Sequence, residues 1–338
     1  VYTRFRNPTV AMFERRLSLL EGAEDCRAMA SDMAAVFASL ASHLNTGDRL
    51  VASRALFGSC HYICAELLPR FGVQIEFVDG ADLNQWKEAL SKPTQAVFLE
   101  SPSNPGLEII DLAPVCQMAR DAGALVVVDN VFATPLLQKP MEFGADVVVY
   151  SATKHIDGQG RCLGGAVMAS TEYIENTITP FIRHTGPALS PFNAWVLLKG
   201  LETLDLRVER HCESALKIAH HLEKKNVLSR VLYPELDSHP QNRLAMSQMK
   251  RGGSVVAFEL KGGKEKAFQF LNALKVIDIS NNLGDAKSLA CHPSTTTHQR
   301  LSEDEKGRVG ITPGFIRLSV GLESVNDLIA DIDSALAA

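Results

Sequence analysis

The feature that most constrains the fold is the alternation of short apolar segments with helical patterns between residues 48 and 170. Short segments rich in β-branched residues and bounded by polar turns predict strands. The expected strands are 48–53, 73–79, the apolar start of 95–105, 124–130, 146–154 and 164–170. Because strands that are apolar throughout are buried on both faces, we expect a mostly parallel sheet covered by helices, in an α/β layer fold.

The segments between these strands have helical spacing and end on glycine. The pattern at 58–72 stops at Gly72, and the pattern at 111–123 stops at Gly123. A further helix is expected to begin within "ERRLSLLEG", at 14–22. Regular exchange of strand and helix patterns is typical of βαβ units, which supports the parallel sheet.

The chain is long enough to require a second domain. Its 338 residues exceed what one hydrophobic core usually holds. A single long helical stretch at 193–225 is expected to bridge to this domain. The second domain should contain strands within 254–263 and 315–323 and helices at 263–274 and 327–338.

The composition does not indicate a nucleic-acid or membrane partner. The net charge is −5, and no apolar stretch is long enough to span a bilayer. The N-terminus lacks the apolar region of a signal peptide, and because it does not begin with Met we expect residues to precede Val1. The seven cysteines are scattered, which favours reduced thiols in a cytoplasmic protein. A lone H-x-D at His155 and Asp157 is weak evidence for metal binding, so no metal site is expected.

Polar residues at the ends of the expected strands are the candidates for chemistry. In open parallel sheets, ligands bind at the carboxyl ends of the strands. Lys154 follows one strand directly, with Ser151 and Thr153 before it, and Asp129 ends the preceding strand. A neutral lysine can bind a carbonyl, hydroxyls can bind a phosphate, and a carboxylate can pair with a ring nitrogen, which together suggest pyridoxal 5′-phosphate. The alternative, a strand-end lysine and a capping aspartate, stays open on spacing alone.

Motifs from several segments make the pattern more specific. They are "YTRFRNPT", "SDMAA", "ESPSNP", "VVVDN", "YSATKHIDGQGR" and "FIRLSVGLE". In this order they resemble the Cys/Met-metabolism family of pyridoxal-phosphate enzymes, which includes cystathionine synthases and lyases, methionine γ-lyases and homoserine sulfhydrylases. The resemblance implies a type I aminotransferase-like fold, with a mostly parallel seven-stranded sheet and a smaller α+β C-terminal domain. It also implies a truncated N-terminal arm at 1–22 contacting a neighbouring subunit, a cofactor-binding domain at 23–200 and a C-terminal domain at 201–338.

The resemblance also implies roles for single residues. Lys154 would be the Schiff-base lysine and proton shuttle, Asp129 would pair with the pyridine nitrogen, and Phe57 would stack on the ring. The expected phosphate ligands are Ser151, Thr153, the backbone at Asp32 and Met33, and Tyr2 and Arg4 reaching from a neighbouring subunit. Asn104 would lie near the ring oxygen, while Arg317 would clamp the substrate α-carboxylate with help from Ser288. The implied assembly is a dimer with shared active sites, within a homotetramer.

Three departures from the common family pattern narrow the expected reaction. Phe57 stands where most members have Tyr, "GQGR" at 158–161 replaces G-H-S-D, and Ser59 stands where methionine γ-lyases have Cys. Phe57 resembles the O-succinylhomoserine sulfhydrylase group and "GQGR" the sulfhydrylase branch, while Ser59 counts against a γ-lyase. The resemblance implies γ-replacement on an O-acylhomoserine by sulfide to give homocysteine. Cystathionine γ-synthase, O-acetylhomoserine sulfhydrylase and methionine γ-lyase activities stay open. So does a non-catalytic binding or regulatory protein, whereas a dehydrogenase would need the missing G-x-G-x-x-G.

The sequence also leads to predictions for Asp32 and Cys60. The family usually has Gly where this chain has Asp32, and an aspartate aimed at a phosphate would repel it. We therefore expect the Asp32 side chain to point away from the phosphate and to cap its helix. Cys60, three residues after Phe57, is a candidate reactive thiol.

Overall fold

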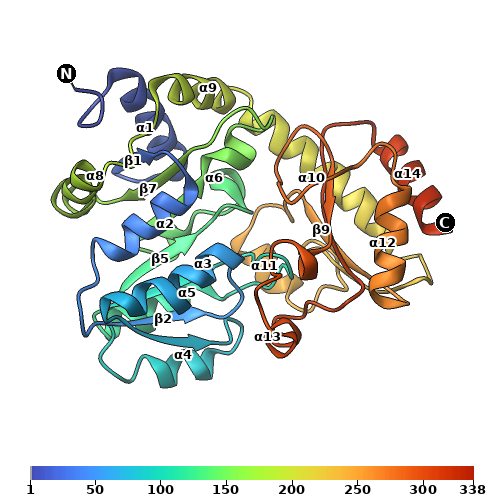
Figure 1. Cartoon of the computed structure of the whole chain (residues 1–338), viewed down its shortest axis with the longest axis horizontal. Coiled ribbons are helices and arrows are strands. Elements are labelled where there is room, and N and C mark those ends of the chain that lie inside the picture. The colour runs from blue at the N-terminus through green and yellow to red at the C-terminus, as the bar shows by residue number, and fades with distance from the viewer. Residues whose placement is uncertain (1) are drawn as a thin grey trace.

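The computed structural model describes residues 2–338, and Val1 lies outside them. Two sheets form the molecule, and helix α10 (Leu204–Leu222) runs from the part that holds the larger sheet toward the smaller one (Figure 1). The larger sheet has seven strands in the order β1-β7-β6-β5-β4-β2-β3. Its strands are β1 (Asp25–Met29), β2 (Arg49–Ser53), β3 (Gln74–Val78), β4 (Ala96–Glu100), β5 (Leu125–Asp129), β6 (Val147–Ser151) and β7 (Gly165–Ala169).

The larger sheet is mostly parallel, which confirms the predicted fold class. Strands β3, β2, β4, β5 and β6 run parallel to one another. Strand β7 is antiparallel to β6, and the edge strand β1 is antiparallel to β7. Strand β1 was not predicted, because Asp25 and Arg27 interrupt its apolar residues. Arg27 is nevertheless buried and donates hydrogen bonds to Asp25 and Thr179.

Helices cover both faces of this sheet, as continuous apolar strands require. In β6, Val148 and Tyr150 pack into the hydrophobic core beneath α1, α5 and α9. Val147 and Val149 point into the opposite core, beneath α2 and α3. The α-helices are α1 (Pro8–Glu21), α2 (Asp32–Ala41), α3 (Gly58–Tyr62), α4 (Leu83–Ala89), α5 (Leu112–Asp121), α6 (Thr134–Leu137), α7 (Thr171–Tyr173), α8 (Thr179–Thr185), α9 (Pro191–Leu201), α10, α11 (Asn242–Gln248), α12 (Gly263–Ala273), α13 (Glu303–Arg308) and α14 (Val325–Ala337).

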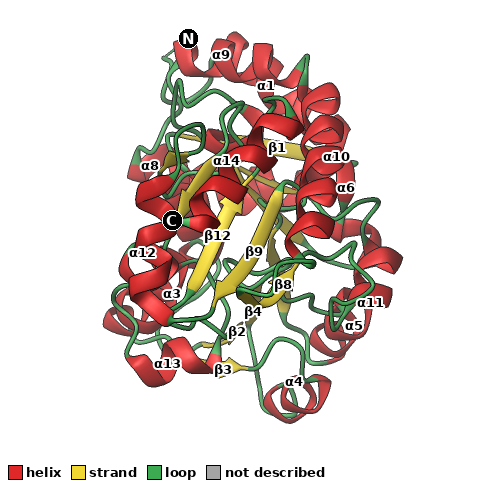
Figure 2. Cartoon of the chain, turned by 90° about the vertical axis from the view of Figure 1, so that its right-hand side faces the viewer, coloured by secondary structure: helices red, strands yellow, loops and turns green. Residues whose placement is uncertain are grey.

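The smaller sheet has five strands in the order β10-β11-β12-β9-β8. They are β8 (Leu228–Leu232), β9 (Val255–Leu260), β10 (Asp278–Ile279), β11 (Leu289–Cys291) and β12 (Phe315–Ser319). Helices α10, α12 and α14 share one hydrophobic core with this sheet (Figure 2). The predicted domain limits, 23–200 and 201–338, stay a prediction.

Two helix predictions need correction. The stretch 193–225 is not one helix, because α9 ends at Leu201 and α10 begins at Leu204. Gly200 weakens the helix at this point, and the Thr203 hydroxyl accepts a hydrogen bond from Arg207 Nε. The N-terminal helix begins at Pro8, earlier than "ERRLSLLEG", because Asn7 caps it by accepting a hydrogen bond from the amide of Thr9. No helix within residues 2–338 is long and apolar enough to cross a membrane.

Candidate active site

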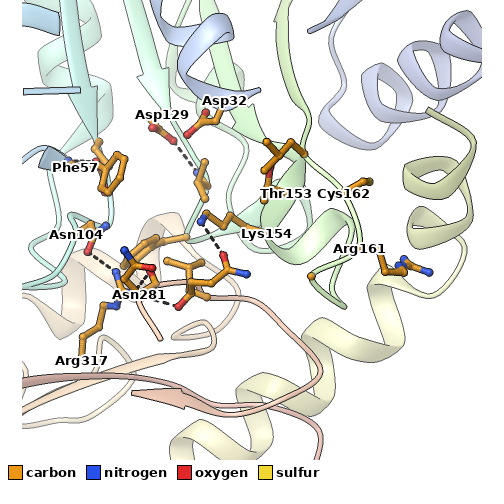
Figure 3. A pocket seen from close by; sticks show the side chains of 17 residues that line it. Asp32, Phe57, Asn104, Asp129, Thr153, Lys154, Arg161, Cys162, Asn281 and Arg317 are labelled. Carbon is orange, nitrogen blue, oxygen red and sulfur yellow. Dashed lines mark hydrogen bonds between the residues drawn. The ribbon is translucent and has the colours of Figure 1, made fainter. Parts of the chain in front are cut away.

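A cavity of about 450 Å³ lies where the carboxyl ends of β4, β5 and β6 face the second sheet. This is the location expected for a ligand site in a parallel sheet. Figure 3 shows Asp32 and Asp129 at one end of the cavity, Arg317 at the other and Lys154 between them. The residues that line it are Asp32, Phe57, Glu100, Asn104, Asp129, Val131, Phe132, Thr153, Lys154, Gly160, Arg161, Cys162, Leu163, Asn281, Asn282, Leu283 and Arg317.

Lys154 lies in the helical turn Ala152–Ile156 that directly follows β6. Its Nζ donates a hydrogen bond to Asn282 Oδ1 at 2.7 Å, which draws the amine toward the second sheet. Burial lowers the pKa of Lys154 and the nearby Arg317 charge lowers it further, while Asp32 and Asp129 partly oppose the shift. A lysine with a lowered pKa supplies a neutral amine, the form that attacks carbonyls and moves protons.

Arg207 of helix α10 stabilises the turn Ala152–Ile156 that contains Lys154. The buried guanidinium donates to the carbonyl oxygens of His155 at 2.6 Å, Gly200 at 2.7 Å and Ile156 at 3.3 Å. These contacts satisfy carbonyls at the end of an irregular turn, where regular helical bonds are missing. The position of Lys154 therefore depends on a residue 53 positions later in the chain.

Three carboxyl groups gather at the cavity. Asp129 ends β5, and its Oδ1 accepts a hydrogen bond from the amide of Val131 at 3.1 Å. Burial raises the pKa of Asp129 well above its ordinary value, and the charges of Asp32 and Glu100 add to this. Burial also raises the pKa of Glu100 to about 8, although its Oε2 accepts the amide of Phe57 at 2.8 Å. Groups this close cannot all ionise at once.

The predicted orientation of Asp32 is wrong. Ser31 caps α2, because its hydroxyl accepts a hydrogen bond from the amide of Ala34 at 3.2 Å. Asp32 is therefore the first residue inside the helix, and its side chain lines the cavity. Its Oδ1 is buried and has no hydrogen-bond partner among residues 2–338.

Arg317 lies at the opposite end, in β12, and is almost completely buried. Its Nη1 donates to Asn104 Oδ1 at 3.0 Å, and its Nη2 donates to the carbonyls of Asn281 at 2.7 Å and Asn282 at 3.2 Å. Its Nε has no hydrogen-bond partner among residues 2–338. A buried cation fixed by neutral acceptors is placed to receive an anion.

The structure brings most of the predicted site residues together, but not all. Asp32, Phe57, Asn104, Asp129, Thr153, Lys154 and Arg317 line the cavity, while Ser151, Met33, Tyr2, Arg4 and Ser288 do not. The role expected for Ser288 stays a prediction. The fully buried hydroxyl of Ser288 donates to Glu323 at 2.8 Å and accepts the amide of Gly321 at 2.8 Å. Arg4 lies by α8 instead, where it donates to the carbonyl of Arg183, and its guanidinium lies over the Tyr2 ring.

Three residues that line the cavity were not predicted as site residues. Asn281 and Asn282 lie in the loop before "LGDAKSL", which has no periodic pattern, and Glu100 was noted only as a strand-end residue.

Cys60, the candidate reactive thiol, does not line the cavity. It is completely buried, and burial together with three nearby carboxyls raises the pKa of its thiol well above the ordinary value. A thiol of this kind is unreactive.

Comparison with known proteins agrees with this geometry. A family model described as Cys/Met metabolism PLP-dependent enzyme matches residues 1–337. An O-succinylhomoserine sulfhydrylase of Mycobacterium tuberculosis is 57% identical over 100% of this chain and 84% of that protein. One of Pseudomonas aeruginosa is 46% identical over 100% and 84%. A crystal structure of cystathionine gamma synthase from Xanthomonas oryzae pv. oryzae, in complex with aminoacrylate and cysteine, has a TM-score of 0.97 at 35% identity, covering 99% of this chain and 87% of that one.

The fold and the lysine-centred cavity are those of an α/β enzyme that uses pyridoxal 5′-phosphate. Within that class, the chain belongs to the Cys/Met metabolism family of PLP-dependent enzymes. The family and the cofactor expected from the sequence are thereby confirmed.

The residues present fit this cofactor with one exception. Lys154, Asp129 and the Phe57 ring line one cavity. The amides of Asp32 and Met33, the first two of α2, donate no hydrogen bond within residues 2–338 and are available to an anion. A Cβ added to Gly165 would lie 2.2 Å from the carbonyl oxygen of Ser31, so β7 packs directly on this helix start. The exception is the Asp32 carboxyl beside the same amides.

Proposed function

We propose that this enzyme replaces the succinate of O-succinylhomoserine by sulfide: the Cγ–O bond breaks, a Cγ–S bond forms, and the products are homocysteine and succinate. The observation that carries the proposal is the buried Arg317, whose Nε has no hydrogen-bond partner within residues 2–338 and which shares a cavity with Lys154. Such a cation suits the carboxylate of an amino-acid substrate. The names of the relatives at 57% and 46% identity support the choice of substrate. Phe57 and "GQGR" at 158–161 support it independently.

When bound, pyridoxal 5′-phosphate supplies an electron sink for the carbon that carries the amino group. We assign to Lys154 both attachment of the cofactor through Nζ and movement of the proton at that carbon. Its burial and lowered pKa support this assignment. Phe57 has no phenol, so no acid or base is available there and the proton transfers fall to Lys154.

The remaining residues would orient cofactor and substrate. Asp129 would face the ring nitrogen, and its burial at the end of β5 supports a role toward a cationic partner. Thr153 and the amides at the start of α2 would hold the phosphate, with Ser151 behind them. Asn104 would lie near the ring oxygen while it orients Arg317. A fixed carboxylate and a flat ring together set which bond is aligned to break.

Asn282 is a further positioning residue in this scheme. It accepts a hydrogen bond from Lys154 Nζ at 2.7 Å, and its carbonyl accepts one from Arg317. One residue therefore connects the amine to the group that binds the substrate carboxylate. Asn282→Ala should change the pH dependence of turnover, because it removes a contact to the base itself.

The experiment that tests the function is a steady-state comparison of O-succinylhomoserine and O-acetylhomoserine, each with sulfide or cysteine. The expected result is the highest kcat/KM with O-succinylhomoserine and sulfide. A higher value with cysteine would assign the enzyme to cystathionine γ-synthase, the main rival, which the solved Xanthomonas structure favours. Higher activity with the acetyl ester, or release of a thiol from methionine alone, would assign it to the other two members of the family.

We propose that the functional unit is a homodimer with shared active sites, within a tetramer. Tyr2 and Arg4 lie away from the cavity of their own chain, which supports a role at the site of a second copy. Helices α1 and α9 pack side by side (Figure 1), and large apolar side chains are exposed along them and the start of α10. These side chains are Met12, Leu19, Phe192, Trp195 and Leu206. An exposed apolar patch of this kind is typical of a protein interface. We also propose a cytoplasmic location, which the seven free cysteines support.

A further inference from the structure

The Asp32 carboxyl has an unusual position for an acid. It is the first residue of the ten-residue helix α2, and its Oδ1 is buried in the cavity without a partner among residues 2–338. A buried carboxylate oxygen that accepts no hydrogen bond is unfavourable unless it is protonated or meets a ligand. Ser31 already caps the helix, so capping does not explain Asp32.

Burial is the largest effect on the Asp32 carboxyl, and it opposes ionisation. From the turn after β6, Lys154 is the one charged side chain that favours the anion of Asp32. The carboxyls of Asp129 on β5 and Glu100 on β4, and the thiol of Cys60 on α3, each feel the charge of Asp32 as a like charge. A phosphate dianion at the start of α2 would add a further negative charge beside the Asp32 carboxyl.

We propose that Asp32 makes cofactor binding proton-linked: its carboxyl is neutral whenever the cofactor phosphate occupies the start of α2, and its O–H then donates to a phosphate oxygen. This rests on the phosphate site assigned under the proposed function. The helix start offers the amides of Asp32 and Met33 as anion ligands, but an ionised carboxylate beside them would repel the phosphate. A protonated carboxyl instead supplies one more donor and satisfies the atom that is now unpaired.

The direction and size of the pH effect on cofactor binding follow from the coupling between protonation of Asp32 and binding of the phosphate. Burial raises the pKa of Asp32 to about 6, against the opposing effect of Lys154, and a bound phosphate raises it further. Below that pH the carboxyl is already neutral, and above it binding must take up a proton. The dissociation constant should therefore rise about tenfold per pH unit above 6, reaching about 100-fold at pH 8.

The test compares pyridoxal 5′-phosphate with pyridoxal, which lacks the phosphate, on the apo-enzyme by equilibrium dialysis between pH 5.5 and 8.5. The readout is the preference for the phosphorylated ligand, the ratio of the two dissociation constants. Changes in Lys154 reactivity affect both ligands and cancel in this ratio. Wild type is compared with Asp32→Asn at each pH, so ionisation of the phosphate itself cancels as well.

The expected result is a preference that is similar in the two proteins near pH 5.5 and about 100-fold greater in Asp32→Asn at pH 8. Glu108→Gln is the matched control, since it makes the same carboxyl-to-amide change at a buried carboxyl whose pKa is raised to about 7 but which does not line the cavity, and it should keep the wild-type pH profile. Asp32→Gly repeats the test without a side chain, and thermal unfolding of each apo-protein verifies folding.

Two outcomes would overturn the inference. The ratio of the two dissociation constants could depend on pH in the same way in wild type, Asp32→Asn and Asp32→Gly. That result would show that protonation of Asp32 is not coupled to binding of the phosphate. If wild type binds pyridoxal as tightly as pyridoxal 5′-phosphate at every pH, the phosphate site itself is wrong. That second result would refute the assigned site together with the inference, so the two failures are distinguishable.

Discussion

Replacing Arg317 by lysine should separate the charge of this residue from its geometry. The guanidinium plane is fixed by hydrogen bonds to Asn104, Asn281 and Asn282, and its Nε–H has no partner within residues 2–338, so it can donate to a carboxylate from a fixed direction. Lysine keeps the charge but offers a single point donor. A hydrogen bond to a charged group contributes about 1.5–3 kcal/mol, so Arg317→Lys should lower kcat/KM by about 10- to 150-fold.

The assay compares O-succinylhomoserine with its α-methyl ester, each with sulfide, in wild type and Arg317→Lys. Wild type should lose much of its kcat/KM on the ester, whereas the variant should lose less, because its contact to the carboxylate is already weakened. Arg161→Lys is the matched control. Arg161 also lines the cavity, but its Nε donates to Asp157 and its side chain points away from Lys154 (Figure 3). Equal losses on the ester in wild type and Arg317→Lys would refute the assignment of the carboxylate site.

Three other predictions concern the lysine, the assembly and stability. Borohydride reduction of the holoenzyme should attach the cofactor to Lys154, detected by peptide mass spectrometry; a label on another residue would disprove the assignment. Mixing Lys154→Ala chains with Arg4→Ala chains should restore activity, since one site of the hybrid is intact, whereas sites within single chains would stay inactive. Burial raises the pKa of Glu21 to about 8, although its Oε2 accepts a hydrogen bond from Tyr150. Wild type should therefore lose stability relative to Glu21→Gln as the pH rises from about 4.5 to 8, by up to about 5 kcal/mol. Urea unfolding at three pH values tests this, and parallel curves would contradict it.

The parallel strands could be predicted from sequence because their local pattern reflects their environment. Strands β4, β5 and β6 are buried on both faces and are continuous apolar segments, such as Val147–Ser151. Strand β1 has the opposite character, since its place in the sheet depends on pairing with β7, about 140 residues later. Its charged residues are accommodated by partners such as Thr179 that no local pattern reveals.

The candidate site also has a part that local sequence patterns predict and a part that only tertiary packing reveals. Lys154, Asp129 and Asn104 lie at the ends of strands of the larger sheet or soon after them, and could be located from those strands. Asn282 meets Lys154 from a loop 128 residues away, so only the packing of the second sheet reveals it. The orientation of Asp32 was mispredicted because two residues with good capping side chains stand next to each other. Ser31 has the extended backbone that the cap position requires, which places Asp32 inside the helix and turns it toward the cavity.

The position of Asp32 also connects cofactor binding to subunit association. In the proposed site, Arg317 is matched by the substrate carboxylate and Asp129 by the ring nitrogen, which leaves the phosphate and Asp32 without an assigned cation. Arg4 of a second copy is the cation proposed for that end. A cation there would also favour the ionised form of Asp32 in the apo-enzyme, which increases the free-energy cost of protonating Asp32 when the phosphate binds. At pH 8, Arg4→Ala should therefore weaken pyridoxal 5′-phosphate binding less in wild type than in Asp32→Asn, measured by equilibrium dialysis of all four proteins. Strictly additive effects would show that the two residues do not face the same phosphate, because groups that share a partner couple.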